Sequence, residues 1–137
     1  MSADFSGTCF SGIWIADLSL SRLRGPQPRA ITIQIEHSDP ELRQEILVTR
    51  RDGSQDRIVF QCATNGEPGK SLLNGKTIRG TAGWQRDELV IESWVQFGAR
   101  EMHFCDHWSL SADGSTLSME HRNDDLAGQL TLLRKTE

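Results

Sequence analysis

The sequence predicts an all-β protein: a single domain over residues 1–137 that forms an antiparallel, up-and-down barrel of about 8–10 strands. Three observations lead to this prediction. Short segments of alternating apolar and polar residues recur about every ten residues, which is typical of sandwich and barrel strands. Asp-Gly and Asn-Gly pairs, which favour tight hairpin turns, lie between several of these segments. Nearly every connection is too short for a parallel crossover, and closure into a barrel pairs both ends of such a meander.

The clearest strand pair lies at residues 104–120, where apolar residues alternate with serines from Trp108 onward. Asp113-Gly114 follows, and an Asp-Gly pair between two alternating runs is the strongest short-range signal for a hairpin turn. Leu117 then resumes the alternation. This segment therefore predicts two antiparallel strands joined by a tight turn.

The first half of the chain follows the same pattern. Its strands are expected within residues 10–17, 31–36, 42–51 and 58–62. Residues 18–29 carry two prolines, which cannot donate hydrogen bonds to a sheet. They therefore predict an irregular connection, with at most a short helical turn before Gly25. Asp52-Gly53 supplies a second Asp-Gly turn, and residues 65–69 form a loop rich in glycine and proline.

The second half of the chain continues the alternation. Residues 71–85 hold one or two strands, which the pair Asn74-Gly75 interrupts. Residues 89–97 alternate over one long strand, and residues 130–134 close the chain after a turn at 123–128. A period of two with one apolar face is typical of half-buried strands, so each segment is expected to turn one face to a core.

Composition and charge exclude several classes of protein. The net charge is -4 and the pI is about 5.5, so the chain lacks the basic character that nucleic-acid binding requires. No apolar run has the length of a transmembrane helix, so membrane insertion is not expected. Residues 1–10 lack the basic and apolar segments of a secretory signal. The three cysteines are odd in number and widely spaced, which favours free thiols in a reducing, cytoplasmic compartment.

Gly12-Ile13-Trp14, in the first strand, resembles the Gly-x-Trp signature of lipocalins and the wider calycin superfamily. In that family the tryptophan plugs the closed end of the barrel, and an arginine near the end of the last strand stacks on it. Arg134 stands in the matching place here, and cation–π attraction is the physical reason for such a pair. Residues 108–117 are also similar to a hairpin of small bacterial lipocalin-like proteins of unknown function.

This resemblance covers most of the chain in strand order but few residues by identity. It implies a lipocalin-like barrel in which Gly12, Trp14 and Arg134 are structural residues of the closed end. The middle lipocalin motif has no match at residues 62–66, the chain has no tyrosine, and the family disulfide has no counterpart. The resemblance therefore implies a fold and not a particular ligand.

The interior of a barrel of about eight strands is either filled by side chains or wide enough for one small ligand. Small residues on inward faces, namely Gly80, Ala82 and Ser93, favour some free space. An apolar cavity with a few polar groups would take a hydrophobic or amphipathic small molecule. The side chains expected to line it are Ile33, Phe60, Trp84, Ile91, Phe104, Asp106, Trp108 and Met119.

Asp106 stands out among these inward residues because it is charged. A buried carboxylate must be paired with a partner or protonated. His37 and His121 also fall on apolar faces and are candidate partners. Three roles follow for Asp106: the polar anchor of a ligand, a base that works with a histidine, or a structural group that is satisfied within the core.

His103, Cys105 and His107 share one face of a predicted strand and offer donors that zinc or copper accepts. Neighbours on one face of a strand lie about 7 Å apart, which is long for ligands of a single ion. The opposite face is the better core face, so these three side chains are expected in solvent and no metal site is predicted. The chain also lacks a nucleophile elbow, a phosphate-binding glycine loop and a His-Glu-x-x-His pattern. No catalytic residue is therefore assigned, and no cofactor is identified.

Trp94 is expected on the outer face, where it would form a homodimer contact or be covered by a loop. The leading hypothesis is a lipocalin-like protein that binds an apolar or amphipathic small molecule inside the barrel. One alternative is a calycin-type enzyme, isomerase- or hydrolase-like, that uses Asp106 with a histidine. The other is a filled barrel that acts through its surface as an interaction or dimerisation module.

Overall fold

The computed structural model describes residues 8–23, 25–67, 71–123 and 128–136. Ten strands and no helix occur among these residues, so the predicted all-β class is confirmed. The predicted loop at 65–69 and the turn at 123–128 lie partly outside the described residues. The strands are β1 (Gly12–Ala16), β2 (Ala30–Ser38), β3 (Glu41–Thr49), β4 (Gln55–Ala63), β5 (Ser71–Leu73), β6 (Lys76–Gln85), β7 (Glu88–Phe97), β8 (Arg100–Leu110), β9 (Thr116–Asn123) and β10 (Gln129–Lys135).

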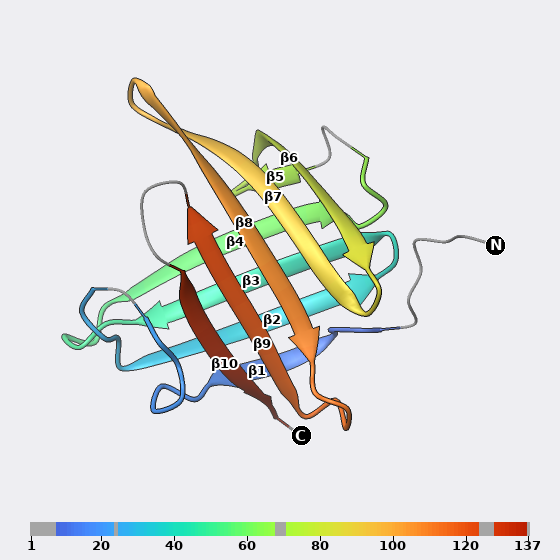
Figure 1. Ribbon diagram of the computed structural model, residues 1–137. Helices are drawn as coiled ribbons and strands as arrows, with labels where there is room; N and C mark the ends of the chain where they lie inside the picture. The colour runs from blue at the N-terminus through green and yellow to red at the C-terminus, as the bar shows by residue number, and fades with distance from the viewer. Residues whose placement is uncertain (1–7, 24, 68–70, 124–127, 137) are drawn as a thin grey trace.

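The strands form a closed barrel in which each strand pairs with its neighbours in sequence (Figure 1). All pairings are antiparallel, and β1 also pairs with β10, so that Trp14 lies opposite Lys135 and Ala16 opposite Leu133. The predicted up-and-down barrel is confirmed, with ten strands. Because this seam pairs the first strand with the last, the meander has no unpaired edge strand among the described residues.

The alternation along β2 shows why these residues form a barrel wall. Ile33, Ile35 and His37 are buried, whereas Gln34 and Glu36 between them are exposed. Successive side chains of a strand point to opposite faces, so the isoleucines turn inward and the polar residues turn to solvent. The face that the sequence predicts as apolar is therefore the interior of the barrel.

The turn between β8 and β9 is held by the side chain of Asp113. Gly114 has a φ of 75°, a conformation that residues with a Cβ rarely adopt. The Asp113 carboxylate accepts hydrogen bonds from the hydroxyls of Ser111 and Ser115 and from the Ser115 amide. These bonds lower the pKa of Asp113 to about 2, and the bond from Ser111 has the largest effect. The Asp-Gly pair thus forms the predicted hairpin turn with both of its residues.

One end of the barrel is filled by aromatic side chains. Phe10 and Trp14 are fully buried, and the Trp14 indole N–H donates to the Phe10 carbonyl over 2.9 Å. The Phe10 ring stacks on Trp84 at 5.6 Å and meets Trp108 edge-on at 5.5 Å. Such stacked and edge-on contacts add to the stabilisation from burial. Trp14 is thus buried among these rings, and its role as the plug of a closed end stays a prediction.

Arg134 does not stack on Trp14, which corrects an expectation from the lipocalin resemblance. Its guanidinium pairs with Asp17 at 3.1 Å, and its side chain is 65% exposed. The cation over the Trp14 ring is Lys135, whose Nζ lies 5.8 Å from the ring centroid. The register explains the exchange: Lys135 lies opposite Trp14, whereas Arg134 lies opposite the outward Ile15.

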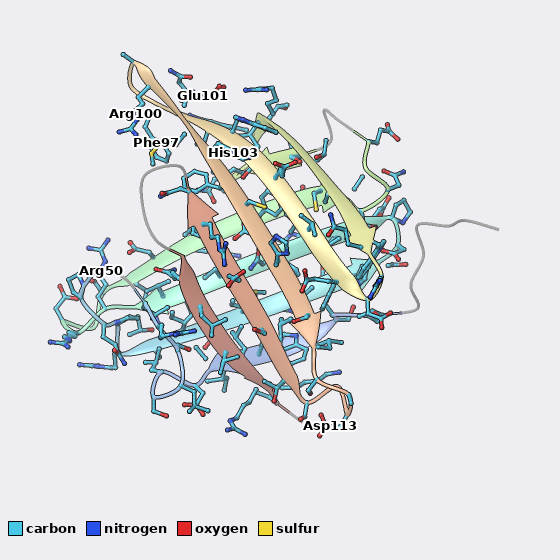
Figure 2. All side chains as sticks on the ribbon, viewed as in Figure 1. Arg50, Phe97, Arg100, Glu101, His103 and Asp113 are labelled. Carbon is cyan, nitrogen blue, oxygen red and sulfur yellow. The ribbon has the colours of Figure 1, made fainter. Side chains whose placement is uncertain are left out.

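The hairpin of β7 and β8 projects beyond the other strands at the opposite end of the barrel (Figure 1). Figure 2 shows Phe97, Arg100 and Glu101 near its tip, and Phe97 is 54% exposed. Residues 18–20 form a hydrogen-bonded turn in place of the helical turn considered before Gly25. Among the described residues there is no helix with the length and apolar character that a membrane crossing requires.

Candidate functional site: a hollow half of the barrel

The barrel interior holds a cavity of about 510 Å³. It extends from Trp108 and Met119, next to the aromatic end, towards Phe97 at the tip of the β7–β8 hairpin. This half of the interior is therefore hollow rather than filled by side chains, and a role of the surface as an interaction or dimerisation module stays a prediction. The cavity is present because Trp14, Trp84 and Phe10 pack together at one end, whereas the side chains that line the other half do not meet across the interior. The remaining lining residues are Ile31, Ile33, Gln44, Ile46, Val48, Ile58, Phe60, Leu73, Asn74, Ile78, Ile91, Ser93, Val95, Phe104, Asp106, His121, Gln129 and Thr131.

Seven of the eight predicted lining residues border this cavity, namely Ile33, Phe60, Ile91, Phe104, Asp106, Trp108 and Met119. Trp84 does not. It lies opposite Leu89 near the aromatic end and stacks on Phe10. Alternation correctly indicates that a side chain faces inward, but it carries no information on its height along the barrel axis. Whether the seven residues bind a ligand stays a prediction.

Asp106 and His121 form a polar pair on the cavity wall. The strand register places them directly opposite each other on β8 and β9, and both side chains line the cavity. His121 Nδ1 lies 2.6 Å from Asp106 Oδ1, and the two side chains are 40% and 23% exposed. The candidate partnership of Asp106 with a histidine is thus realised by His121. The imidazole Nδ1–H donates to the carboxylate.

The charge on this pair is set mainly by their mutual hydrogen bond. That bond raises the pKa of His121, and partial burial of the ring opposes the rise without cancelling it. The Phe104 ring stacks on the imidazole at 5.1 Å, which holds the ring in place. With Nδ1 bound to Asp106, the second ring nitrogen, Nε2, has no hydrogen-bond partner among the described residues. It is the free donor or acceptor of the pair.

Gln44 and Ser93 are further polar residues of the cavity wall. Ser93 was expected on an inward face, but neither residue was among the predicted lining residues. Gln44 is 6% exposed and Ser93 is 7% exposed. The signal for Gln44 was present in the sequence, because it lies on the same face as Leu42 and Ile46. Alternation alone would have placed its amide inside the barrel.

His37, the other candidate partner, is a structural residue of the aromatic end. Its Nδ1 accepts a hydrogen bond from the Phe10 amide over 3.1 Å, and its Nε2 contacts the Asp39 carboxylate. Its ring stacks on Phe10 at 5.5 Å. Both ring nitrogens are therefore occupied, and His37 has none left for a ligand.

His103, Cys105 and His107 lie on the outer face of β8. Each imidazole contacts a glutamate of β7: His103 Nε2 lies 3.0 Å from Glu92, and His107 Nδ1 lies 2.6 Å from Glu88. Cys105 Sγ lies 3.6 Å from His107 Nε2. Partial burial and then the charge of Glu92 raise the pKa of the Cys105 thiol, which disfavours the nucleophilic thiolate. No group of three or more His, Cys, Asp or Glu side chains in the described part of the chain is arranged to hold a metal ion.

Trp94 lies on the outer face, as its position in the alternation predicts. The Arg79 guanidinium lies 4.3 Å from the ring centroid, and the His103 ring stacks at 4.7 Å. These neighbours cover part of the indole from within the chain. A homodimer contact at Trp94 stays a prediction.

Gly12, the third residue assigned to the closed end, has a φ of 143°. A Cβ at this position would come within 2.8 Å of Cε of Lys135, the side chain that lies over Trp14. The backbone conformation therefore favours glycine here, whereas the flexible end of the Lys135 side chain can move away from a Cβ.

No protein-family model matches the chain, and none of the curated proteins matches it. The resemblance to lipocalins thus depends on Gly12-Ile13-Trp14 and on the barrel itself. The closed antiparallel barrel is consistent with a calycin-like fold.

Proposed function

We propose that the protein binds an apolar or amphipathic small molecule in the hollow half of its barrel. The cavity carries this proposal: about 510 Å³ lies within the range of roughly 300–1,000 Å³ that is common for small-molecule sites. Its wall is mostly aliphatic and aromatic, with a few polar groups, which is the usual composition of such sites. A calycin-like barrel is compatible with this role.

The driving force for binding would be the removal of apolar surface from water. Each Å² of apolar surface that is buried contributes about 25 cal/mol before the costs of association are subtracted. Asp106 and His121 would set the orientation of the ligand, because a polar group of an amphipathic molecule can bind the free Nε2 of His121. The aliphatic side chains would then enclose the apolar part.

The test is a titration with N-phenyl-1-naphthylamine, an uncharged probe whose fluorescence rises in apolar surroundings. Two variants on adjacent residues of β3 give a matched comparison. Ile46→Trp places a large ring in the cavity, whereas Leu47→Trp places the same ring on the outer face, because only Ile46 lines the cavity. We expect micromolar binding to the wild type and to Leu47→Trp, and at least a tenfold loss for Ile46→Trp. Equal binding to all three proteins would place the probe elsewhere and contradict the proposal.

A second candidate function is enzymatic proton transfer, and the Asp106–His121 hydrogen bond favours it. A histidine whose Nδ1 is held by a carboxylate presents Nε2 as an acid or base to a molecule in the adjoining space. This is the arrangement expected of a calycin-type isomerase or hydrolase. An enzyme of this kind would bind a small molecule in the same cavity and would also convert it.

The two candidates differ in whether the bound molecule changes. Extracts of small metabolites would be incubated with the wild type and with His121→Phe, and then compared by mass spectrometry. A compound that is consumed only by the wild type supports an enzyme. A compound that is retained by the wild type without conversion supports a binding protein and removes the enzymatic candidate.

A further inference from the structure

The Gln44 carboxamide borders the cavity and has only one weak hydrogen-bond partner among the described residues of the protein. Gln44 is only 6% exposed, yet its one contact is from Nε2 to the Met119 sulfur at 3.9 Å. A thioether sulfur is a weak acceptor, and an amide can donate two hydrogen bonds and accept two. Among the described residues nothing else binds this side chain.

The surroundings of Gln44 explain why no protein group serves it. Its cross-strand neighbours are Ile35 on β2 and Phe60 on β4, and both are apolar. Leu42 and Ile46 flank it on the same face of β3. Buried polar groups are normally paired, so the hydrogen-bonding positions of this amide that no described residue fills are open to a molecule in the cavity.

The position of Gln44 along the barrel differs from that of the Asp106–His121 pair. Gln44 contacts Met119, and Met119 precedes His121 by two residues on the same face of β9. Two residues along a strand span about 7 Å. Met119 also lies opposite Trp108, which belongs to the aromatic end. Gln44 is thus the deeper polar group, and His121 is nearer the β7–β8 tip.

We propose that Gln44 is the inner hydrogen-bonding anchor of the ligand, so that the ligand has polar groups at both ends. The end that enters first would carry a hydroxyl or carbonyl group that binds the Gln44 amide. The other polar group would lie at the Asp106–His121 pair, and an apolar segment of roughly 7 Å or more would join the two. This inference rests on the proposed function, because it names the class of small molecule that the cavity takes.

The probes for the test are unbranched 1-alkanols and the α,ω-diols of the same length, from six to twelve carbons. All are uncharged, so each pair differs only in the second hydroxyl group. Their affinities are measured by displacement of N-phenyl-1-naphthylamine. The decisive quantity is the ratio of diol affinity to alkanol affinity, compared between the wild type and Gln44→Leu. Gln34→Leu is the matched control, because Gln34 is exposed on the outer face of β2.

We expect Gln44→Leu to lower the ratio of diol affinity to alkanol affinity about fivefold at the chain length that binds the wild type most tightly. A change of this size corresponds to the loss of one hydrogen bond. Gln34→Leu should leave the ratio unchanged. If Gln44→Leu does not fold, Gln44→Met provides the same comparison, because its side chain has similar length and no amide. If the alkanols bind but Gln44→Leu leaves the diol-to-alkanol ratio unchanged, the role of Gln44 as an anchor is overturned and the proposed function still stands. Failure of both the probe and the alkanols to bind the wild type would overturn both proposals.

Discussion

The hydrogen bond between Asp106 and His121 should stabilise the fold in a pH-dependent way. The perturbation is a double-mutant cycle of Asp106→Asn and His121→Phe, together with the double variant. Phenylalanine keeps a ring at position 121 for stacking on Phe104 and removes the imidazole nitrogens. The cycle isolates the coupling of the two side chains, because effects that each single variant has by itself cancel in the comparison.

The size of the coupling follows from the exposure of the pair. A hydrogen bond to a charged group contributes about 1.5–3 kcal/mol when it is buried, and an exposed ion pair contributes about 0–1 kcal/mol. The side chains of His121 and Asp106 are 40% and 23% exposed, so solvent screens the pair in part. We expect a coupling of about 1 kcal/mol. With a urea m-value of about 2 kcal/mol/M, this shifts the unfolding midpoint by about 0.5 M.

The sign of the pH dependence follows from the direction of the pKa shift. The folded-state pKa of His121 is raised above its ordinary value of 6.5. The coupling is therefore fully present below pH 6.5 and is lost as the pH rises through the folded-state pKa. Urea unfolding at pH 5.5 and pH 9, followed by circular dichroism, measures it. NMR titration of His121 should show that Asp106→Asn lowers its pKa, since only burial then acts. A coupling that is equal at both pH values, or larger at pH 9, would refute this account.

Three further predictions concern the rest of the barrel. Phe10→Ala should destabilise the protein by about 3–5 kcal/mol in urea unfolding, because Phe10 is fully buried; a loss under 1 kcal/mol would contradict the described packing. Gly80→Ala should cost about 1–3 kcal/mol, because its Cβ would lie 2.7 Å from the Glu92 carbonyl oxygen. Gly83→Ala, on the same strand with open space around it, should change stability by less than about 1 kcal/mol; equal effects would remove the steric explanation. Burial raises the pKa of the Cys62 thiol to about 12, so a disulfide reagent at pH 8 should modify the exposed Cys9 quickly and Cys62 only after unfolding.

The fold could be predicted from the sequence because its signals are local. Alternation with a period of two places Ile33 inward and Gln34 outward whatever the strand order is. Asp113-Gly114 and Asn74-Gly75 mark turns through the backbone conformation that glycine permits, and both glycines have positive φ. Short connections then leave antiparallel neighbours as the simplest topology.

The candidate site could be predicted only in part, because its geometry depends on register and on height along the barrel. Asp106 was expected inside and near a histidine, but only the β8–β9 register selects His121 over His37. Trp84 faces inward as expected, yet its place beside Phe10 puts it outside the cavity. Register also explains why Lys135, and not the expected Arg134, lies over the Trp14 ring, because the pairing of β1 with β10 places Lys135 opposite Trp14.

The division of the interior into an aromatic half and a hollow half also indicates where ligand specificity would arise. An apolar wall discriminates weakly, because one methylene group changes affinity by about 1–3 kcal/mol at most. A site with buried hydrogen-bonding groups discriminates more strongly, because a wrong ligand leaves those groups unpaired. Substitutions at Ile33 or Phe60 should therefore weaken all ligands in parallel. Substitutions at Gln44 or His121 should change the order in which ligands are preferred, and a ligand series measured on both kinds of variant would separate the two effects.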